Sequence, residues 1–239
     1  MENGIKALLF DVFGTVVDWR GGVARDVAQV APSVDAAAFA VAWRAGYRPA
    51  MDQVRRGELP WTKLDGLHRR ILDDMLADFG LLALSEAEKE WLNTSWHRLD
   101  PWPDALEGLH RIKRRFTVAT LSNGNVSLLV DMARRAGISW DCVFSAELFG
   151  HYKPDPATYL GAVGLLSLTP PEVMLVAAHN SDLAAAAEQG LATAFVRRPG
   201  EDSEPAGQYT YAAADLAELA MLLGALSGLP CSCRCRSIR

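Results

Sequence analysis

Apolar residues along this chain gather in short runs separated by polar turns. Such runs, when mostly apolar and bounded by turn residues, predict strands that are buried on both faces. The last of the series ends at Val196, and the weakest is 141–145. The predicted strands are residues 5–10, 116–121, 141–145, 173–178 and 192–196.

Helical patterns lie between these runs. One helix runs through Arg135, and a second opens near Pro156, where proline suits a first turn. A third, rich in alanine, ends at Gln189 before Gly190. Repeated strand–helix units of this kind predict an α/β fold, a doubly wound parallel-sheet (Rossmann-like) core with right-handed crossovers.

The pattern changes to successive helices between about residues 20 and 99. Apolar residues recur at three- and four-residue intervals over 38–56 and again over 64–79. Ser85 and Glu88 form a capping box that opens a third helix, expected to extend to Leu99. We expect a helical cap inserted after the first strand. The predicted division is core 1–19 and 100–226, cap 20–99 and a disordered tail 227–239.

Length and charge narrow the class of protein. The 239 residues suffice for one α/β domain with an insert. The net charge of −5 and the scattered basic pairs argue against nucleic acid as a partner. No run of about 18 uncharged apolar residues occurs, and the N-terminus lacks the shape of a signal peptide. We therefore expect a cytoplasmic protein without membrane contact, and a homodimer is possible.

The four cysteines predict neither a disulfide framework nor a zinc site. Cys142 lies alone in a strand-like segment and is expected to be a small core residue. Cys231, Cys233 and Cys235 fall in the tail, where their alternate spacing lacks a Cys-x-x-Cys pair. The tail is expected to have no function.

Asp11 is the first candidate for chemistry, because it follows the strand at 5–10. A carboxylate there lies in the crevice where open α/β sheets bind ligands. Two positions later stands Phe13, which neither donates nor accepts a proton. The pair provides a nucleophile but no acid for a leaving alcohol, so a leaving group that needs no proton, such as a halide, fits.

Other polar residues follow the remaining strands and would converge on the same crevice. In chain order the four segments carry Asp11 with Thr15, Ser122 with Asn123, Lys153, and Asp182. This order, with an early helical insert, resembles the haloacid dehalogenase superfamily over about residues 5–200. Phosphatases of that superfamily hold magnesium with further carboxylates. Here Phe13 and Ala177–Ala178 replace them, so we expect no metal and no cofactor.

The same features resemble the 2-haloacid dehalogenases that act on L-substrates. The resemblance implies that Asp11 attacks the halogen-bearing carbon, that Arg44 receives the halide, and that Asp182 helps to activate water. Several relatives carry Ser-Ser-Asn where this chain has Ala177–Ala178–His179, so His179 or Asn180 would supply the missing hydrogen bonds. The residues implied to bind substrate are Phe13, Thr15, Ser122, Asn123, Tyr159, His179 and Asn180.

Elementary electrostatics agrees with these roles. Two carboxylates in one cleft repel, and the Lys153 cation would keep both ionised. The guanidinium of Arg44 is always charged and would stabilise a departing halide. Each assignment has a plainer alternative. Asp11 would be a turn-forming residue of a degenerate enzyme and Lys153 a surface loop residue. Arg44 would be a solvated helix residue, Tyr159 a packed ring and His179 a structural histidine.

The sequence thus predicts a hydrolase of carbon–halide bonds that converts short 2-haloalkanoic acids to 2-hydroxy acids without metal, through an ester on Asp11. A small-metabolite phosphatase and a pseudoenzyme that binds a small carboxylate are the alternatives. A near rival keeps the mechanism and releases fluoride.

Overall fold

The computed structural model describes residues 4–225 of the chain. Within them lies a six-stranded sheet of order β5-β4-β1-β6-β7-β8, in which every pairing is parallel. This confirms the predicted doubly wound α/β core. The predicted tail at 227–239, with its cysteines, lies outside the described residues. The strands are β1 Ala7–Phe10, β4 Thr117–Ser122, β5 Cys142–Ser145, β6 Val173–Ala177, β7 Ala192–Val196 and β8 Tyr211–Ala213.

β1 lies in the middle of the sheet, where the strand order changes direction. It pairs with β4 on one side and β6 on the other, so that Phe10 faces both Thr120 and Val176 across the ladders. Ligands of open α/β sheets bind at the carboxyl ends of strands beside such a switch point. Asp11 follows β1 directly and its backbone N–H still donates to the carbonyl of Val176 at 3.0 Å.

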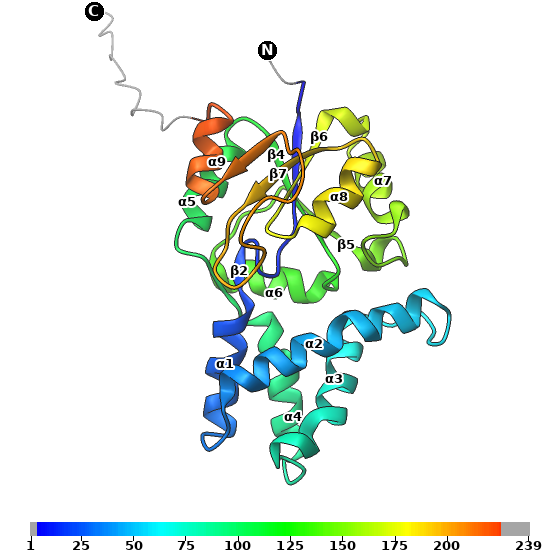
Figure 1. Ribbon diagram of the computed structural model, residues 1–239, viewed down its shortest axis with the longest axis vertical. Coiled ribbons are helices and arrows are strands. Elements are labelled where there is room, and N and C mark those ends of the chain that lie inside the picture. Colours follow the sequence, from blue (N-terminus) through cyan, green and yellow to red (C-terminus); the bar gives the residue numbers. More distant parts are fainter. Residues whose placement is uncertain (1–3, 226–239) are drawn as a thin grey trace, which may run out of the picture.

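Helices cover both faces of the sheet, because successive side chains of β1 point to opposite faces and both faces are apolar. Leu8 and Phe10 belong to one apolar cluster, with α5, α6 and α9, while Leu9 belongs to the cluster under α7 and α8. Figure 1 shows α5 and α9 on one side of the strands and α7 and α8 on the other. These helices are α5 Ala105–Lys113, α6 Val126–Ala136, α7 Pro156–Leu165, α8 Asn180–Glu188 and α9 Leu216–Leu222.

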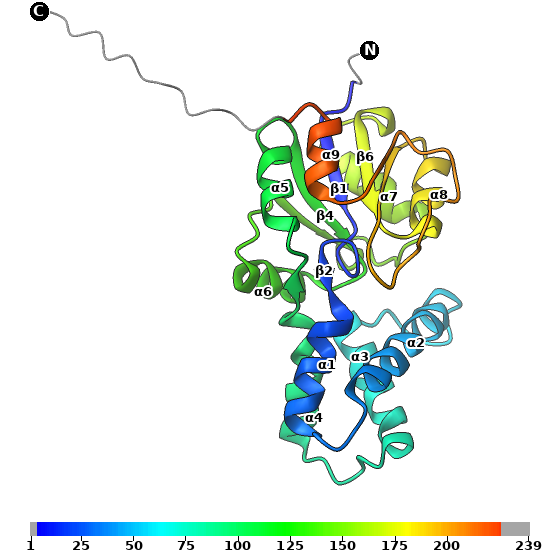
Figure 2. The ribbon, with the colours of Figure 1, turned by 60° about the vertical axis from the view of Figure 1, so that its left-hand side comes forward.

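The helices predicted between residues 20 and 99 form a separate lobe beyond the carboxyl ends of the strands (Figures 1 and 2). The predicted helix at 64–79 is α3 followed by a tighter 3₁₀ turn that ends at Gly80. The capping box of Ser85 and Glu88 is present, but α4 ends before Leu99 and gives way to another 3₁₀ turn. The elements of the lobe are α1 Trp19–Val30, α2 Ala36–Arg55, α3 Leu64–Met75, η1 Leu76–Phe79, α4 Glu86–Asn93 and η2 Thr94–His97.

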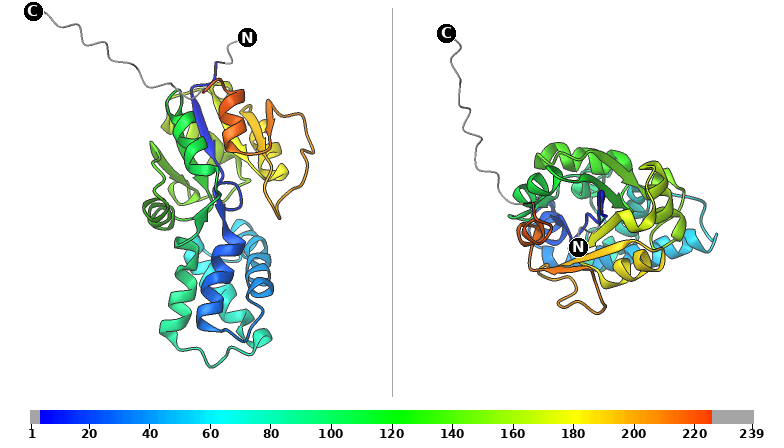
Figure 3. Two further views of the ribbon diagram at one scale, coloured as in Figure 1. Left: turned by 90° about the vertical axis from the view of Figure 1, so that its left-hand side faces the viewer. Right: turned by 90° about the horizontal axis from the view of Figure 1, so that it is seen from above.

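A short antiparallel ribbon joins this lobe to the core. β2, Val17–Asp18, pairs with β3, Asp100–Pro101. Figure 2 shows β2 between the two lobes, and the left view of Figure 3 shows the helical lobe below the sheet lobe. We keep the division of core and cap near residues 19 and 100 as a proposal.

A polar contact between α3 and α6 also links cap and core. The amide Nδ2 of Asn125, the N-cap of α6, donates to Asp65 of α3 at 2.8 Å. The ring of His97 lies between Asp65, at 3.2 Å, and Asp131 of α6, at 2.9 Å. The ribbon and this polar contact are two of the links between cap and core. None of the helices within residues 4–225 has the length and apolarity needed to cross a bilayer.

Candidate active site

The carboxylate of Asp11 is buried and held at both oxygens. Its Oδ2 accepts from the hydroxyl of Thr15 at 2.8 Å, and its Oδ1 accepts from Lys153 Nζ at 3.0 Å. The hydroxyl of Thr15 in turn accepts from the backbone N–H of Ala178, just after β6, at 2.9 Å. Two adjacent strand ends therefore fix the orientation of Asp11.

Lys153 lies between two carboxylates. Its ammonium group donates to Asp11 and also to Asp182. Its backbone N–H donates to Asn123 Oδ1 at 2.7 Å, which ties the loop after β5 to the end of β4. The other oxygen of Asp182 accepts from the hydroxyl of Tyr159 at 2.6 Å. Residues from four segments thus meet at one point, as predicted.

These contacts set the charges of the two groups. Burial raises the pKa of Asp11, but Lys153 and His179 outweigh burial and hold that pKa well below its usual range. Burial alone would lower the pKa of Lys153, whereas Asp11 and Asp182 together raise it. At neutral pH Asp11 is an ionised carboxylate beside an ammonium cation, the state in which a carboxylate can act as a nucleophile.

His179 is a second cation at the same carboxylate. Its Nδ1 lies 3.0 Å from Asp11 Oδ2 and its Nε2 lies 3.0 Å from Glu201 Oε2. Burial opposes the charged form, but the two carboxylates raise the pKa of His179 to about 10. The ring is therefore an imidazolium at neutral pH and donates to both carboxylates. His179 therefore lies in direct contact with Asp11.

Glu201 reaches His179 because glycine leaves room for it. Gly14 has a φ of 81°, and a Cβ built there would lie 2.5 Å from Glu201 Oε1. That oxygen accepts from Trp19 Nε1, at the start of α1, at 2.6 Å. The loop after β7 is thus held against both the catalytic turn and the cap.

A cavity of about 270 Å³ opens beside Asp11, between core and cap. Arg44, on α2, lines this cavity. Its Nη1 is buried and has no hydrogen-bond partner among the described residues. Its guanidinium carbon lies 4.0 Å from the ring centre of Tyr47 and 5.6 Å from that of Trp19. The cavity is lined by Asp11, Phe13, Arg44, Tyr47, Arg48, Met51, Asp52, Arg55, Asn123, Lys153, Pro154, Tyr159, His179, Ser181 and Asp182.

Three of the predicted substrate contacts do not line this cavity: Thr15, whose hydroxyl holds Asp11, and also Ser122 and Asn180. The buried hydroxyl of Ser122 accepts from the backbone N–H of Gly124 at 3.1 Å and shapes the turn after β4. Asn180 faces away from Asp11, because its side chain donates to the carbonyl of Glu204 at 3.0 Å and accepts from Ala206 N at 2.8 Å. Neither side chain lines the cavity, and both hold loops that shape it.

Some residues of the site do not stand out in the sequence. Glu201 lies in a loop without periodic pattern, and no motif marks it. Tyr47, Met51 and Arg55 share the cavity face of α2 with Arg44, which a helical projection from Arg44 would have found. Arg48 and Arg55 also line the cavity, so Arg44 is not the only arginine of α2 that faces it.

The residues present do not fit a divalent cation. Asp11 and Asp182 are carboxylates on opposite sides of Lys153, whose ammonium group already bridges them. Within residues 4–225 no group of three or more His, Cys, Asp or Glu side chains is arranged to hold a metal ion. Metal independence remains a prediction that chelation tests.

Known proteins with the same fold and sequence pattern identify the family. The family model of haloacid dehalogenase-like hydrolases matches residues 5–190. The (S)-2-haloacid dehalogenase 4A of Burkholderia cepacia is 30% identical over 215 residues, which is 85% of this chain and 88% of the relative. The crystal structure of a defluorinating L-2-haloacid dehalogenase has a TM-score of 0.89 and 45% identity, covering 92% of this chain and 95% of that one. Another L-2-haloacid dehalogenase structure has a TM-score of 0.88 and 46% identity, covering 93% and 100%.

Proposed function

Because the chain belongs to the haloacid dehalogenase-like hydrolases, we propose that it hydrolyses the carbon–halogen bond of (S)-2-haloacids to give 2-hydroxy acids. One observation carries the proposal at the site. An ionised carboxylate, Asp11, lines the same cavity as a guanidinium nitrogen of Arg44 that has no hydrogen-bond partner within residues 4–225. A nucleophile and an anion receptor are the groups that a displacement of halide by carboxylate requires.

In the first step Asp11 attacks the halogen-bearing carbon. Its Oδ2 already accepts two hydrogen bonds, from Thr15 and His179, whereas Oδ1 accepts one, from Lys153. Oδ1 therefore has the freer lone pair and forms the new carbon–oxygen bond. The carbon–halogen bond breaks, the halide keeps the electron pair, and it leaves toward Nη1 of Arg44.

In the second step water attacks the carboxyl carbon of the ester on Asp11. Asp182, which is oriented by hydrogen bonds from Tyr159 and Lys153, accepts a proton from this water. Thr15 and His179 already donate to the oxygen that becomes negative in the tetrahedral intermediate. Its collapse expels the hydroxy-acid oxygen, which takes the proton from Asp182, and the regenerated Asp11 ionises.

A single turnover in H₂¹⁸O, with enzyme in excess over 2-chloropropionate, tests this route. The label should enter the side chain of Asp11, and the first product should carry ordinary oxygen with an inverted carbon centre. Asp11→Asn should abolish turnover. Label that appears directly in the product, with an unlabelled Asp11 peptide, would mean that water attacks the substrate carbon.

Fluoride is the second leaving group to consider, because a solved relative at 45% identity is described as defluorinating. Measuring halide release from fluoro-, chloro- and bromoacetate shows whether the enzyme releases fluoride or only the heavier halides. Restored activity on phosphate esters with magnesium would favour a phosphatase, and binding without turnover a pseudoenzyme. The homodimer and the cytoplasmic location remain predictions.

A further inference from the structure

We propose that Arg198 is a positioning residue for the second step of the reaction, because it holds in place both groups that donate to Asp11 Oδ2. This inference rests on the proposed function and adds a residue to it. Arg198 lies just after β7, is only 5% exposed, and does not line the reaction cavity. It therefore acts through Thr15 and His179, and not on the substrate itself.

The first route from Arg198 to the nucleophile runs through the turn that carries Thr15. Arg198 Nε donates to the backbone carbonyl of Thr15 at 2.8 Å. The carbonyls on either side accept from Trp102: Gly14 from the ring Nε1 at 2.9 Å, and Val16 from the backbone N–H at 3.0 Å. Three successive carbonyls of this turn are thus bonded from outside it. These bonds fix the direction in which the Thr15 hydroxyl points.

The second route runs through the loop after β7, which the side chain of Arg198 anchors. The backbone carbonyl of Arg198 accepts from the N–H of Glu201 at 3.3 Å. Glu201 Oε2 lies 3.0 Å from His179 Nε2, and His179 Nδ1 lies 3.0 Å from Asp11 Oδ2. Thr15 donates to the same oxygen of Asp11, so the two routes end at one atom.

Arg198 can hold these groups because its own guanidinium is fixed. Nη1 and Nη2 donate to the two oxygens of Asp104 at 2.6 and 2.9 Å, the paired geometry that a planar guanidinium forms with a carboxylate. Asp104 also accepts from the backbone N–H of Leu216 at 2.8 Å. The guanidinium carbon of Arg198 lies 5.7 Å from the ring centre of Trp102, the residue that holds the neighbouring carbonyls.

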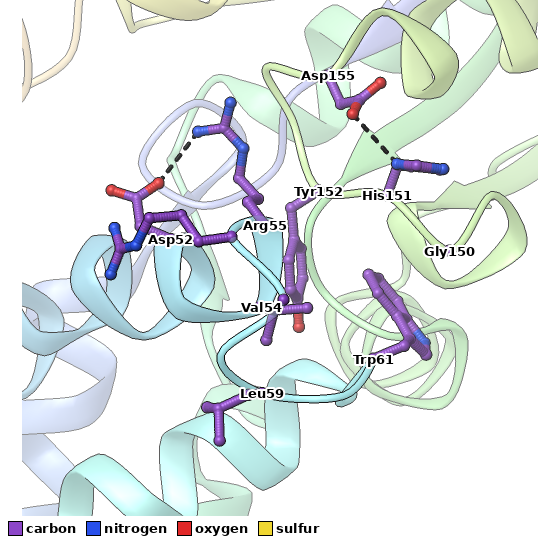
Figure 4. Close-up of a pocket in the computed structure, with 11 residues that line it drawn as sticks. Asp52, Val54, Arg55, Leu59, Trp61, Gly150, His151, Tyr152 and Asp155 are labelled. Atoms are coloured by element: carbon purple, nitrogen blue, oxygen red, sulfur yellow. Dashed lines mark hydrogen bonds and ion pairs between the residues drawn. The ribbon is translucent and has the colours of Figure 1, made fainter.

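Burial distinguishes this pair from more exposed charge pairs of the molecule. Figure 4 shows two such pairs beside a groove near the end of α2: Arg55 with Asp52, and His151 with Asp155. The side chains of Arg55 and His151 are 42% and 53% exposed, whereas that of Arg198 is 4% exposed. Solvent weakens exposed pairs, so a buried pair is better suited to fix a backbone.

The two steps make different demands on Oδ2 of Asp11. In the first step negative charge leaves the carboxylate, so a loss of donors at Oδ2 does not oppose attack by Oδ1. In the second step Oδ2 becomes the oxyanion of the tetrahedral intermediate, and donors that are already in place stabilise it. Displaced donors should therefore slow hydrolysis of the ester more than release of halide.

The test uses full-length enzyme in excess over (S)-2-chloropropionate, with samples quenched in acid at successive times. Halide release reports the first step, and the intact mass of the protein reports the ester on Asp11. Arg198→Lys keeps a positive charge beside Asp104, but an ammonium group cannot form the paired contact and the bond to Thr15 together. This variant should hydrolyse the ester about 10–10²-fold more slowly than wild type, so that the ester accumulates, while halide is released at the wild-type rate.

A second variant and a control complete the test. Arg198→Met removes every donor of the side chain and should accumulate more ester than Arg198→Lys does. The lysine variant retains the charge pair, so it carries the test alone should the methionine variant fail to fold. Arg197→Lys is the matched control, because Arg197 is the preceding residue but its side chain is 51% exposed and pairs with Glu204. Both of its rates should equal those of wild type.

Three results would overturn the proposal. In the first, Arg198→Lys accumulates no more ester than wild type does. In the second, halide release slows as much as ester hydrolysis, which would mean that Arg198 only stabilises the fold. In the third, Arg197→Lys accumulates as much ester as Arg198→Lys. A wild-type enzyme that releases no halide is distinguishable from these, because it removes the proposed function and this inference with it.

Discussion

Asp11 owes its ionised state to a balance among neighbouring charges. Two cations, Lys153 and His179, contact it directly, and each is held by a further carboxylate, Asp182 for the lysine and Glu201 for the histidine. Buried carboxylates and cations here neutralise one another in pairs, which limits the cost of burying them. A substitution of Asp182 or Glu201 should therefore change the pKa of the cation that it contacts, and through that cation the environment of Asp11.

Glu201→Gln should move the alkaline limb of kcat/KM to lower pH. Glu201 helps to raise the pKa of His179 to about 10, so without it the imidazolium loses its proton earlier and Asp11 loses a donor. Rates measured between about pH 6 and 11 report the shift. Glu204→Gln is the control, because that exposed carboxylate in the same loop pairs with Arg197 instead. An alkaline limb that stays in place would contradict the imidazolium role.

The same raised pKa makes a prediction about stability. A histidine with a raised folded-state pKa stabilises the fold fully below its unfolded pKa of about 6.5 and loses that contribution as pH rises through the folded value. For His179 the window is therefore from about 6.5 to about 10. Relative to wild type, His179→Gln should lower Tm less at pH 10.5 than at pH 6. Equal decreases in Tm at the two pH values would contradict the charged pair.

Arg44→Ala should slow halide release by about 10²–10³, the usual effect of removing a preorganised donor. The reason is its buried Nη1, which has no partner among the described residues and lines the cavity with Asp11. Arg70→Ala is the control, because Arg70 is an exposed arginine of the cap, on α3, that does not line the cavity. Equal and small effects would make Arg44 a structural residue held by Tyr47 and Trp19.

The residues that sequence could predict are those at the ends of strands. Asp11, Lys153 and Asp182 follow apolar runs, and parallel strands bring their carboxyl ends to one edge of the sheet. Glu201 could not be predicted in this way, since it reaches His179 from a loop whose course depends on the space left by Gly14. Asn180 was misplaced because the residue next to His179 points to the opposite side of the helix start.

Among the elements, long periodic segments were predicted most closely. The pattern predicts a helix at 38–56 and the structure has α2 at Ala36–Arg55, while β7 matches its predicted range 192–196. The sequence does not predict the ribbon of β2 and β3, because each strand has two residues and is too short to show an alternation of apolar and polar residues. β8 was missed for a similar reason: it has three residues and is held by pairing with β7, a contact that its own sequence does not reveal.

The contact of His97 with α6 predicts a pH-dependent link between the lobes. Burial lowers the pKa of His97, but Asp65 and Asp131 outweigh it and raise that pKa, so the ring is charged at pH 6. This stabilisation is present below the unfolded pKa of about 6.5 and is lost as pH rises through the raised value. Asp131→Asn should lower Tm at pH 6 by about 2 °C and by less at pH 9. Scanning calorimetry measures both.

The control for this link is Asp74→Asn. Asp74 is an exposed carboxylate of α3 and does not contact His97. It should change Tm little at either pH. A loss of Tm in Asp131→Asn that is as large at pH 9 as at pH 6 would show that the contact does not depend on the charge of His97.

At the scale of the whole molecule, the reaction cavity belongs to neither lobe alone. The core supplies the nucleophile and its cations, and α2 of the cap supplies Arg44 and Tyr47. A site closed between two lobes excludes water, which strengthens each charge interaction inside it. It also explains why the cap is inserted so soon after β1: the ribbon of β2 and β3 joins the cap helices to the core next to the end of β1.

The same arrangement of charges predicts that activity survives exhaustive chelation. Lys153 occupies the position between Asp11 and Asp182 that a bridging cation would need, and His179 supplies a second positive charge. A divalent ion would add charge to carboxylates that already have cationic partners, and Phe13 offers it no ligand. Halide release is to be followed before and after EDTA, with and without added magnesium. Loss of turnover that magnesium restores would show that a metal, and not Lys153, keeps Asp11 reactive.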